Sequence, residues 1–216
     1  MNTLLTTQFI AHYALTGSIA TAPFKETKAT YFELKDDATL IYYNVGDGIA
    51  PHKNNSNLQV KVVNYEAFHT DLPATFRHGK KICDLVVYTS LADNYFSLCE
   101  LTDTASHRVP PFTDLGGNAF PGKRSTAQTQ LTSTLTLLSA VTDIKVFMAK
   151  FTIKRCCFFN KQATPIPAGT VTITAPTTFS RVNTITEEGF EMSHPAIEAL
   201  GFTLFEYSGG KAAKIA

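Results

Sequence analysis

The sequence predicts a mixed α/β fold of the α+β type, built on a central mixed sheet flanked by helices. Several segments alternate apolar and polar residues as strands do, and residues 127–141 repeat apolar side chains at helical spacings of three and four. Of 216 residues, 44% are hydrophobic and 17% are charged, which is enough apolar material for a large core. We expect a single domain, with the core in residues 58–158, a helix and a hairpin in residues 1–57, and an extension in residues 159–216 that packs on the core.

The first part of the chain predicts a short helix followed by a hairpin. Residues 4–15 place four side chains at helical spacing: Leu5, Phe9, His12 and Tyr13. Residues 29–45 are typical of a hairpin, in which ATYFEL and TLIYYNV flank the turn KDDA. We expect Glu33 and Lys35 on the solvent face of this hairpin. Residues 46–57 are a loop by composition.

Three strands are expected in the middle of the chain. LQVKVV, at 58–63, alternates as a strand should. A polar connection that ends in RHGKK, at 77–81, leads to strands at 82–89 and 95–102. Residues 103–124 are rich in proline, glycine and polar residues, so we expect a long loop there, and loops of that length are usually functional or mobile.

A helix and a strand are expected after this loop. Ser125 is a candidate N-cap, and the helix that follows has a regular apolar face: Ala127, Leu131, Leu135, Leu138 and Val141. Residues 146–159 predict a long strand with one alternating face: Phe147, Ala149, Phe151 and Ile153. A strand–helix–strand crossover favours parallel pairing. Further along, we expect a strand at 170–174, a helix near 194–200 and a strand at 202–207.

Charge and cysteine content limit the classes of function that the chain could have. The net charge of about +1 argues against a strongly electrostatic binder of nucleic acid or membranes, although a local basic patch remains open. The four cysteines form no C-x-x-C pair, which predicts buried free thiols in a reducing compartment. Residues 1–20 lack the pattern of a signal peptide, and no segment reaches transmembrane length. We therefore expect a soluble, cytoplasmic protein with no membrane partner.

Each strand of the 82–102 hairpin carries one acidic residue among apolar neighbours. If Thr89 faces Tyr95, then Asp84 faces Glu100, and both carboxylates lie on one face of the sheet. Directly opposed side chains have Cβ atoms about 4.5–5.5 Å apart, so the two anions repel unless a divalent metal lies between them. The alternative is that Asp84 ends a strand and Glu100 lies at a solvated edge.

Three segments of the chain resemble a known family. They are KKICDLVVY at 80–88, FSLCELTDT at 96–104 and GKRSTAQTQLTSTLTLL at 122–138. Together they resemble the PD-(D/E)xK nuclease superfamily, which has the restriction-endonuclease-like fold. The third segment is similar to the K-x-x-x-A-x-x-Q-L stretch that follows the acidic strand in some bacterial members. The resemblance covers about residues 80–158, and it implies that the central mixed sheet belongs to a nuclease-like core.

The resemblance also implies roles for individual residues. Asp84 and Glu100 match the acids that hold one or two divalent metals, Mg²⁺ or Mn²⁺, in this family. The family's lysine, two residues after the glutamate, is replaced here by Thr102. Lys123 is the candidate for a displaced lysine, and Gln130 resembles the auxiliary glutamine of some members. The alternatives are a solvated loop lysine and a surface glutamine.

Basic residues near the two acids are candidates for contacts with a nucleic-acid backbone. They are Arg77, Lys80, Lys81 and Arg124. The alternative for the cluster before the first acidic strand is a solvated turn.

These observations lead to two main hypotheses. The first is a metal-dependent nuclease that cleaves DNA or RNA, and a role in restriction, defence or a mobile element follows from the resemblance alone, as does a homodimer or a larger defence-type complex. The second is a degraded nuclease-like domain that binds nucleic acid or a protein. An unrelated α/β domain, in which the hairpin register differs, is a third reading.

Overall fold

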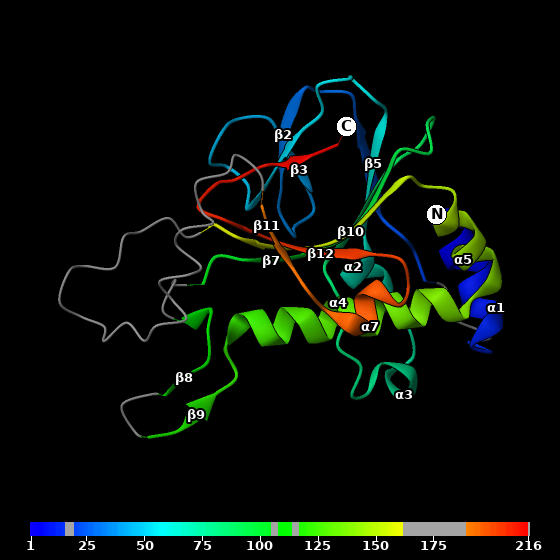
Figure 1. Ribbon diagram of the computed structural model, residues 1–216. Helices are drawn as coiled ribbons and strands as arrows, with labels where there is room; N and C mark the ends of the chain where they lie inside the picture. The colour runs from blue at the N-terminus through cyan, green and yellow to red at the C-terminus, as the bar shows by residue number, and fades with distance from the viewer. Residues whose placement is uncertain (16–19, 105–107, 114–116, 162–188, 216) are drawn as a thin grey trace.

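A seven-stranded mixed sheet forms the centre of the computed structural model (Figure 1). The structure describes five stretches of the chain: 1–15, 20–104, 108–113, 117–161 and 189–215. In spatial order the strands are β1 (Phe24–Thr27), β5 (Val60–Asn64), β6 (Leu85–Thr89), β7 (Tyr95–Thr102), β10 (Ile153–Asn160), β12 (Thr203–Ser208) and β11 (Phe190–Met192). Strands β7, β10 and β12 are parallel to one another, and the other neighbours are antiparallel. The predicted mixed α/β class is therefore confirmed.

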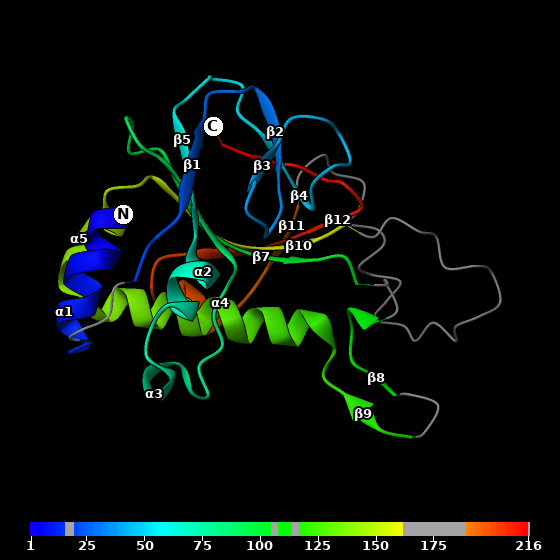
Figure 2. The ribbon, with the colours of Figure 1, turned by 180° about the vertical axis from the view of Figure 1, so that it is seen from behind.

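A second, smaller sheet covers one face of the first. Its strands in spatial order are β13 (Ala213–Lys214), β4 (Ala50–Lys53), β2 (Tyr31–Leu34) and β3 (Ile41–Tyr42). A separate two-stranded ribbon, β8 (Phe112–Thr113) with β9 (Ala119–Phe120), extends from the body before the long helix. The C-terminus lies at the small sheet, and the N-terminus lies beside α5 (Figure 2).

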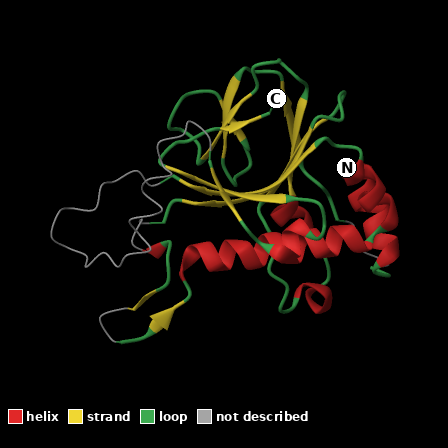
Figure 3. Cartoon of the chain, in the orientation of Figure 1, coloured by secondary structure: helices red, strands yellow, loops and turns green. Residues whose placement is uncertain are grey.

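Helices gather on the opposite face of the central sheet (Figure 3). They are η1 (Leu4–Phe9), α1 (Ile10–His12), α2 (Tyr65–Thr70), α3 (Ala74–Arg77), α4 (Gly122–Ala140), α5 (Thr142–Ala149) and α7 (Pro195–Glu198). The longest of them, α4, lies against β7 and β10. Among the described residues, no single helix is long and apolar enough to cross a membrane, and α4 and α5, bent by 109° at their junction, reach the required length and composition only as a pair.

The central sheet separates two hydrophobic cores because side chains alternate along each strand. On β6 and β10, Val86, Cys156 and Phe158 point to the helices, whereas Leu85 and Cys157 point to the small sheet. All four cysteines are buried free thiols, as predicted. Asp84 and Glu100 have the same parity as the residues that face the helices, and this side is where the site is found.

Most of the predicted elements are present. The N-terminal helix, the hairpin at 29–45, the strand at 58–63 and the two acidic strands all form where they are expected. So do the apolar face of α4, the helix near 194–200 and the strand at 202–207. The crossover from β7 to β10 is parallel, as the strand–helix–strand order favours.

The prediction of one long strand at 146–159 is wrong for its first part. Helix α5 continues to Ala149, and β10 begins only at Ile153. Ile144, Met148 and Phe151 are buried at spacings of four and three, while Ala149 is exposed. The apolar residues of this segment fit a helix and a strand equally well in the sequence. In the structure, burial of one helical face decides for the helix.

Two other expectations also differ from the structure. Residues 46–57 are not entirely loop, because Ala50, Pro51 and His52 are buried in β4 between β2 and β13. Ser125 is not the N-cap of the long helix, which begins three residues earlier at Gly122. The strand expected at 170–174 lies outside the described residues.

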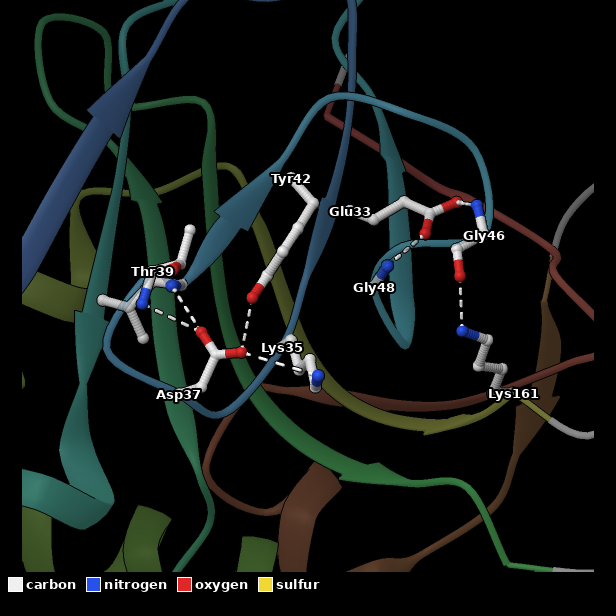
Figure 4. A network of polar contacts seen from close by, with 9 residues as sticks. Glu33, Lys35, Asp37, Thr39, Tyr42, Gly46, Gly48 and Lys161 are labelled. Atoms are coloured by element: carbon white, nitrogen blue, oxygen red, sulfur yellow. Dashed lines mark hydrogen bonds and ion pairs between the residues drawn. The ribbon is translucent and has the colours of Figure 1, made fainter.

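Glu33 does not lie on a solvent face as predicted. Its side chain is 3% exposed, and its two carboxylate oxygens accept hydrogen bonds from the backbone N–H groups of Gly46 (2.8 Å) and Gly48 (2.7 Å) (Figure 4). A Cβ at Gly48 would stand 2.5 Å from the Cβ of Glu33, so only glycine allows this approach. Lys35 is exposed, as expected.

Candidate metal site and basic pocket

The hairpin of β6 and β7 has the register that the sequence predicts. Val86 pairs with Leu98 and Leu85 with Cys99, and extending this register by one residue sets Asp84 opposite Glu100. The Asp84 N–H donates to the Cys99 carbonyl at 3.1 Å just beyond the paired residues. The two acids are therefore neighbours across the strands, on the face covered by α4.

Both acids are nine-tenths buried, but their carboxylates differ in hydrogen bonding. Asp84 and Glu100 are each 9% exposed. Asp84 Oδ2 accepts a hydrogen bond from the Leu101 N–H at 2.6 Å. Glu100 Oε2 is buried and has no hydrogen-bond partner among the described residues. A buried carboxylate oxygen without a partner is costly, so this position favours a bound cation or a proton.

Two further acids complete a cluster. Asp36, Glu66 and Asp84 each offer one carboxylate oxygen, and these oxygens lie within 4.8 Å of one another. Glu66 stands in the first turn of α2, whose N-cap Asn64 accepts from the Ala67 N–H at 2.7 Å. The Asn64 side chain also donates to Asp36 at 3.2 Å. Glu100 lies beside this trio and is not part of it.

Asp36 reaches the site because its turn is held rigidly. The neighbouring Asp37 accepts hydrogen bonds from the N–H groups of Thr39 (2.9 Å) and Leu40 (3.1 Å) and from the Tyr42 hydroxyl (2.5 Å) (Figure 4). An aspartate that bonds the backbone two and three residues ahead is a common way to fix a turn. The turn of the small sheet thus supplies an acid to a site on the central sheet.

The acids raise one another's pKa values. Burial, and then the charge of Asp36, raise the pKa of Asp84 to about 7. Burial and the charges of Asp84 and Glu66 raise the pKa of Glu100 to about 9. Hydrogen bonding to Asp36, together with burial, raises the pKa of Glu66 to about 7. The cluster therefore holds protons near neutral pH, and a divalent cation would displace them.

Helix α4 brings two predicted residues to the acids. Gln130 Nε2 donates to the Ile82 carbonyl at 2.9 Å, and the Gln130 side chain lies near enough to Glu100 to lower the pKa of that carboxyl. Lys123 is exposed, and its positive charge acts on Glu100 to lower the pKa of that carboxyl. The two side chains are seven residues apart, about two helical turns, so they share one side of the helix. Both residues therefore act on Glu100 from the same helix.

The start of α4 depends on a glycine. Gly122 has a φ of +78°, and a Cβ there would stand 2.3 Å from the Pro110 carbonyl oxygen. Only glycine fits both conditions. Because Lys123 follows directly, this close approach also sets where its side chain begins.

No cation replaces the missing lysine on β7 itself. Thr102 has the same parity as Glu100 on the strand, and its hydroxyl shares a hydrogen bond of 2.7 Å with Thr104. A hydroxyl cannot supply positive charge. Lys123, across the β7–α4 connection, is the described cation that acts on Glu100.

A pocket of about 430 Å³ lies beside the acids. Its lining includes three of the predicted basic residues: Arg77, Lys80 and Lys81. Glu66 and Gln130 also line it, so the pocket and the acid cluster share a wall. Three of the four predicted backbone contacts are thus gathered next to the carboxylates.

Arg124, the fourth predicted contact, is engaged elsewhere. Its Nε donates to Glu206 Oε2 at 2.7 Å, and its Nη2 donates to Glu206 Oε1 at 3.1 Å. The Glu206 side chain is 8% exposed, so this two-point ion pair is largely shielded from water. The guanidinium of Arg124 fastens α4 to β12.

Sequence reasoning missed Asp36 and Glu66. The signal for Glu66 was local: VVNYEAF reads as a strand, an N-cap asparagine and an acid in the first helical turn. Asp36 had no such signal, because its position depends on how the small sheet packs on the central one. No protein-family model, curated protein or solved structure matches this chain.

Proposed function

We propose that the protein is a metal-dependent nuclease that hydrolyses phosphodiester bonds of DNA or RNA. One observation carries the proposal: a carboxylate cluster, with an unpartnered buried oxygen on Glu100, shares a wall with a pocket lined by three cations. Carboxylates bind hard divalent cations, and Lys and Arg side chains contact phosphates. Hydrolysis of a phosphodiester by a metal-dependent nuclease needs both the metal and the contacts with the phosphate.

The donor set fits Mg²⁺ or Mn²⁺. Asp36, Glu66 and Asp84 present only oxygens, within 4.8 Å of one another, and oxygens bound to one ion at about 2.0–2.2 Å lie at most about 4.4 Å apart. A small adjustment of exposed Asp36 and Glu66 closes that difference. Glu100 Oε2 is a further buried carboxylate oxygen beside this trio, without a hydrogen-bond partner among the described residues. When bound, the metal would polarise the scissile phosphate and lower the pKa of a water.

The chain's own residues have separate roles in this proposal. Gln130, which lies beside Glu100 and lines the pocket, would orient the Glu100 carboxylate toward the site. Lys123 supplies the positive charge that Thr102 cannot, and it would stabilise negative charge on the phosphate. The order of the elements also supports the resemblance to PD-(D/E)xK nucleases, because the strands with the acids precede a helix and a further parallel strand.

Cleavage by isosteric variants tests the proposal. The purified protein is incubated with single- and double-stranded DNA and RNA, with Mg²⁺ or Mn²⁺. We expect Asp84→Asn and Glu100→Gln each to lower the rate at least about a hundredfold, because each removes a negative charge from the site that would hold the metal. Asp143→Asn, at the start of α5, is the matched control and should cleave normally. Full activity in both site variants would rule the proposal out.

A degraded, non-catalytic site is the second candidate, and Thr102 favours it. In that case the same fold binds nucleic acid or a protein without cleaving. Titration calorimetry with Mn²⁺ separates the two candidates. If Mn²⁺ binds the wild type and this binding is lost in Asp84→Asn, the result supports the nuclease. If calorimetry detects no specific Mn²⁺ binding to the wild type, the result supports the degraded module.

A further inference from the structure

The basic pocket has more positive charge than a bridging phosphate needs. Arg77, Lys80 and Lys81 contribute three formal charges, and Glu66 is the acid in the lining, which leaves a balance of at least two positive charges. An internal phosphodiester carries one negative charge, whereas a terminal phosphomonoester carries about 1.5–2 at neutral pH. The charge of the pocket therefore matches a strand end better than the middle of a strand.

Two of the cations are held in place. Arg77 Nε donates to the Leu72 carbonyl at 2.8 Å, which orients the guanidinium. Lys80 donates to the Phe76 carbonyl, and its Nζ lies 4.0 Å from the centre of the Phe76 ring. A charge that is already positioned loses less side-chain entropy when a ligand binds.

His69 provides an uncharged polar atom in the same pocket. The residue is 5% exposed, and its Nε2 has no hydrogen-bond partner among the described residues. Burial, and then the charges of Arg77 and Lys80, lower the pKa of His69 to about 4, so the ring is neutral at pH 7. A neutral imidazole can donate one hydrogen bond to a phosphate oxygen without adding charge.

We propose that this pocket binds the terminal phosphomonoester, with its nucleotide, at one end of a nucleic-acid strand. A volume of about 430 Å³ exceeds what a phosphate alone requires and is within the range of small-ligand sites. Thr70, Thr126 and Gln130 add polar groups to the lining. The inference rests on the proposed function for one point: because Glu66 and Gln130 line both sites, a phosphodiester near the bound end would lie at the carboxylates.

Binding of oligonucleotides that carry a fluorophore on an internal base tests the inference without catalysis. Three single strands of one sequence are compared by fluorescence anisotropy: one with a 5′-phosphate, one with a 3′-phosphate and one with hydroxyls at both ends. The protein is Asp84→Asn in EDTA, so that no strand is cut. We expect one of the phosphorylated strands to bind at least about tenfold more tightly than the unphosphorylated strand, as one or more charge-assisted hydrogen bonds provide.

Variants assign the preference to the pocket. A double variant, Lys80→Gln with Lys81→Gln, should lose the preference for the phosphorylated strand. The control, Lys145→Gln on α5, removes an exposed lysine outside the pocket lining and should keep it. Equal binding of all three strands, or a preference that survives the double variant, would overturn the inference.

The two proposals fail in different ways. A protein that prefers a phosphorylated end but cleaves nothing with Mg²⁺ or Mn²⁺ would refute the nuclease and leave the pocket assigned. A protein that cleaves in a manner dependent on Asp84, yet binds all three strands equally, would refute the pocket and leave the nuclease standing.

Discussion

Glu100 gives the sharpest test of the site, through the stability of the metal-free protein. We consider Glu100→Gln, which keeps the shape of the side chain but removes the charge. Burial, together with the charge of Asp84, raises the pKa of Glu100 from 4.5 to about 9. Between those two pH values, the native protein holds a proton at this residue that the unfolded chain releases.

The magnitude follows from proton linkage. An acid with a raised pKa in the native state lowers stability as pH rises, by about 1.4 kcal/mol for each pH unit between the unfolded and folded pKa values. From pH 6 to pH 8, the wild type should therefore lose about 3 kcal/mol relative to Glu100→Gln. Glu66 and Asp84 titrate in both proteins, so the difference in pH dependence between the two unfolding free energies reports the titration of Glu100.

The assay is urea unfolding in EDTA, followed by circular dichroism because the chain has no tryptophan. The free energy of unfolding is measured for both proteins at pH 6, 7 and 8, and equal m-values show that the two transitions are comparable. Adding Mn²⁺ at 100 times its dissociation constant should stabilise the wild type at pH 8 by about 2.7 kcal/mol and the variant by much less.

The same pH dependence of the unfolding free energy in both proteins would refute the reasoning. If the wild type and Glu100→Gln change equally between pH 6 and pH 8, Glu100 is not held protonated by burial and by its neighbours. The electrostatic argument for a cation at this position would then fail as well.

Three further predictions concern the fold and are measured by urea unfolding. Leu131→Ala should cost about 2–5 kcal/mol because Leu131 is fully buried under the sheet, whereas Thr129→Ala on the exposed side of α4 should cost less than about 0.5. Glu33→Ala should cost about 2–4 kcal/mol because it leaves two backbone N–H groups without their acceptor, and a change below about 0.5 would contradict that role. Arg124→Met should cost about 2–4 kcal/mol because Glu206 is left buried and unpaired, and Arg124→Met combined with Glu206→Gln should recover part of that loss.

Some of the fold could be predicted because local pattern and geometry agree. The register of Asp84 and Glu100 follows from one hairpin in which each strand alternates, and a slip of one residue would turn every apolar side chain to the wrong face. The apolar face of α4 was equally clear, because its repeat at three and four residues fits only a helix.

Other features depend on packing that no local pattern encodes. Residues 146–149 form an apolar run that fits a strand, yet they belong to α5, where Ile144 and Met148 are buried together because α5 packs beside η1. The burial of Glu33 depends on Gly46 and Gly48, which stand more than ten residues away. For the same reason, the contribution of Asp36 to the site could not be read from its own segment.

The adjacent cysteines of β10 offer a chemical view of how the molecule opens. Cys156 lies in the core shared with the helices, and Cys157 lies in the core shared with the small sheet. Each can be alkylated only when its own layer separates from the central sheet. Labelling followed by peptide mass spectrometry therefore measures, within one dipeptide, the opening free energy of each layer separately. If Asp36 joins a metal site with Glu66 and Asp84, added Mn²⁺ should slow the labelling of Cys157, because the ion would tie the small sheet to the central one.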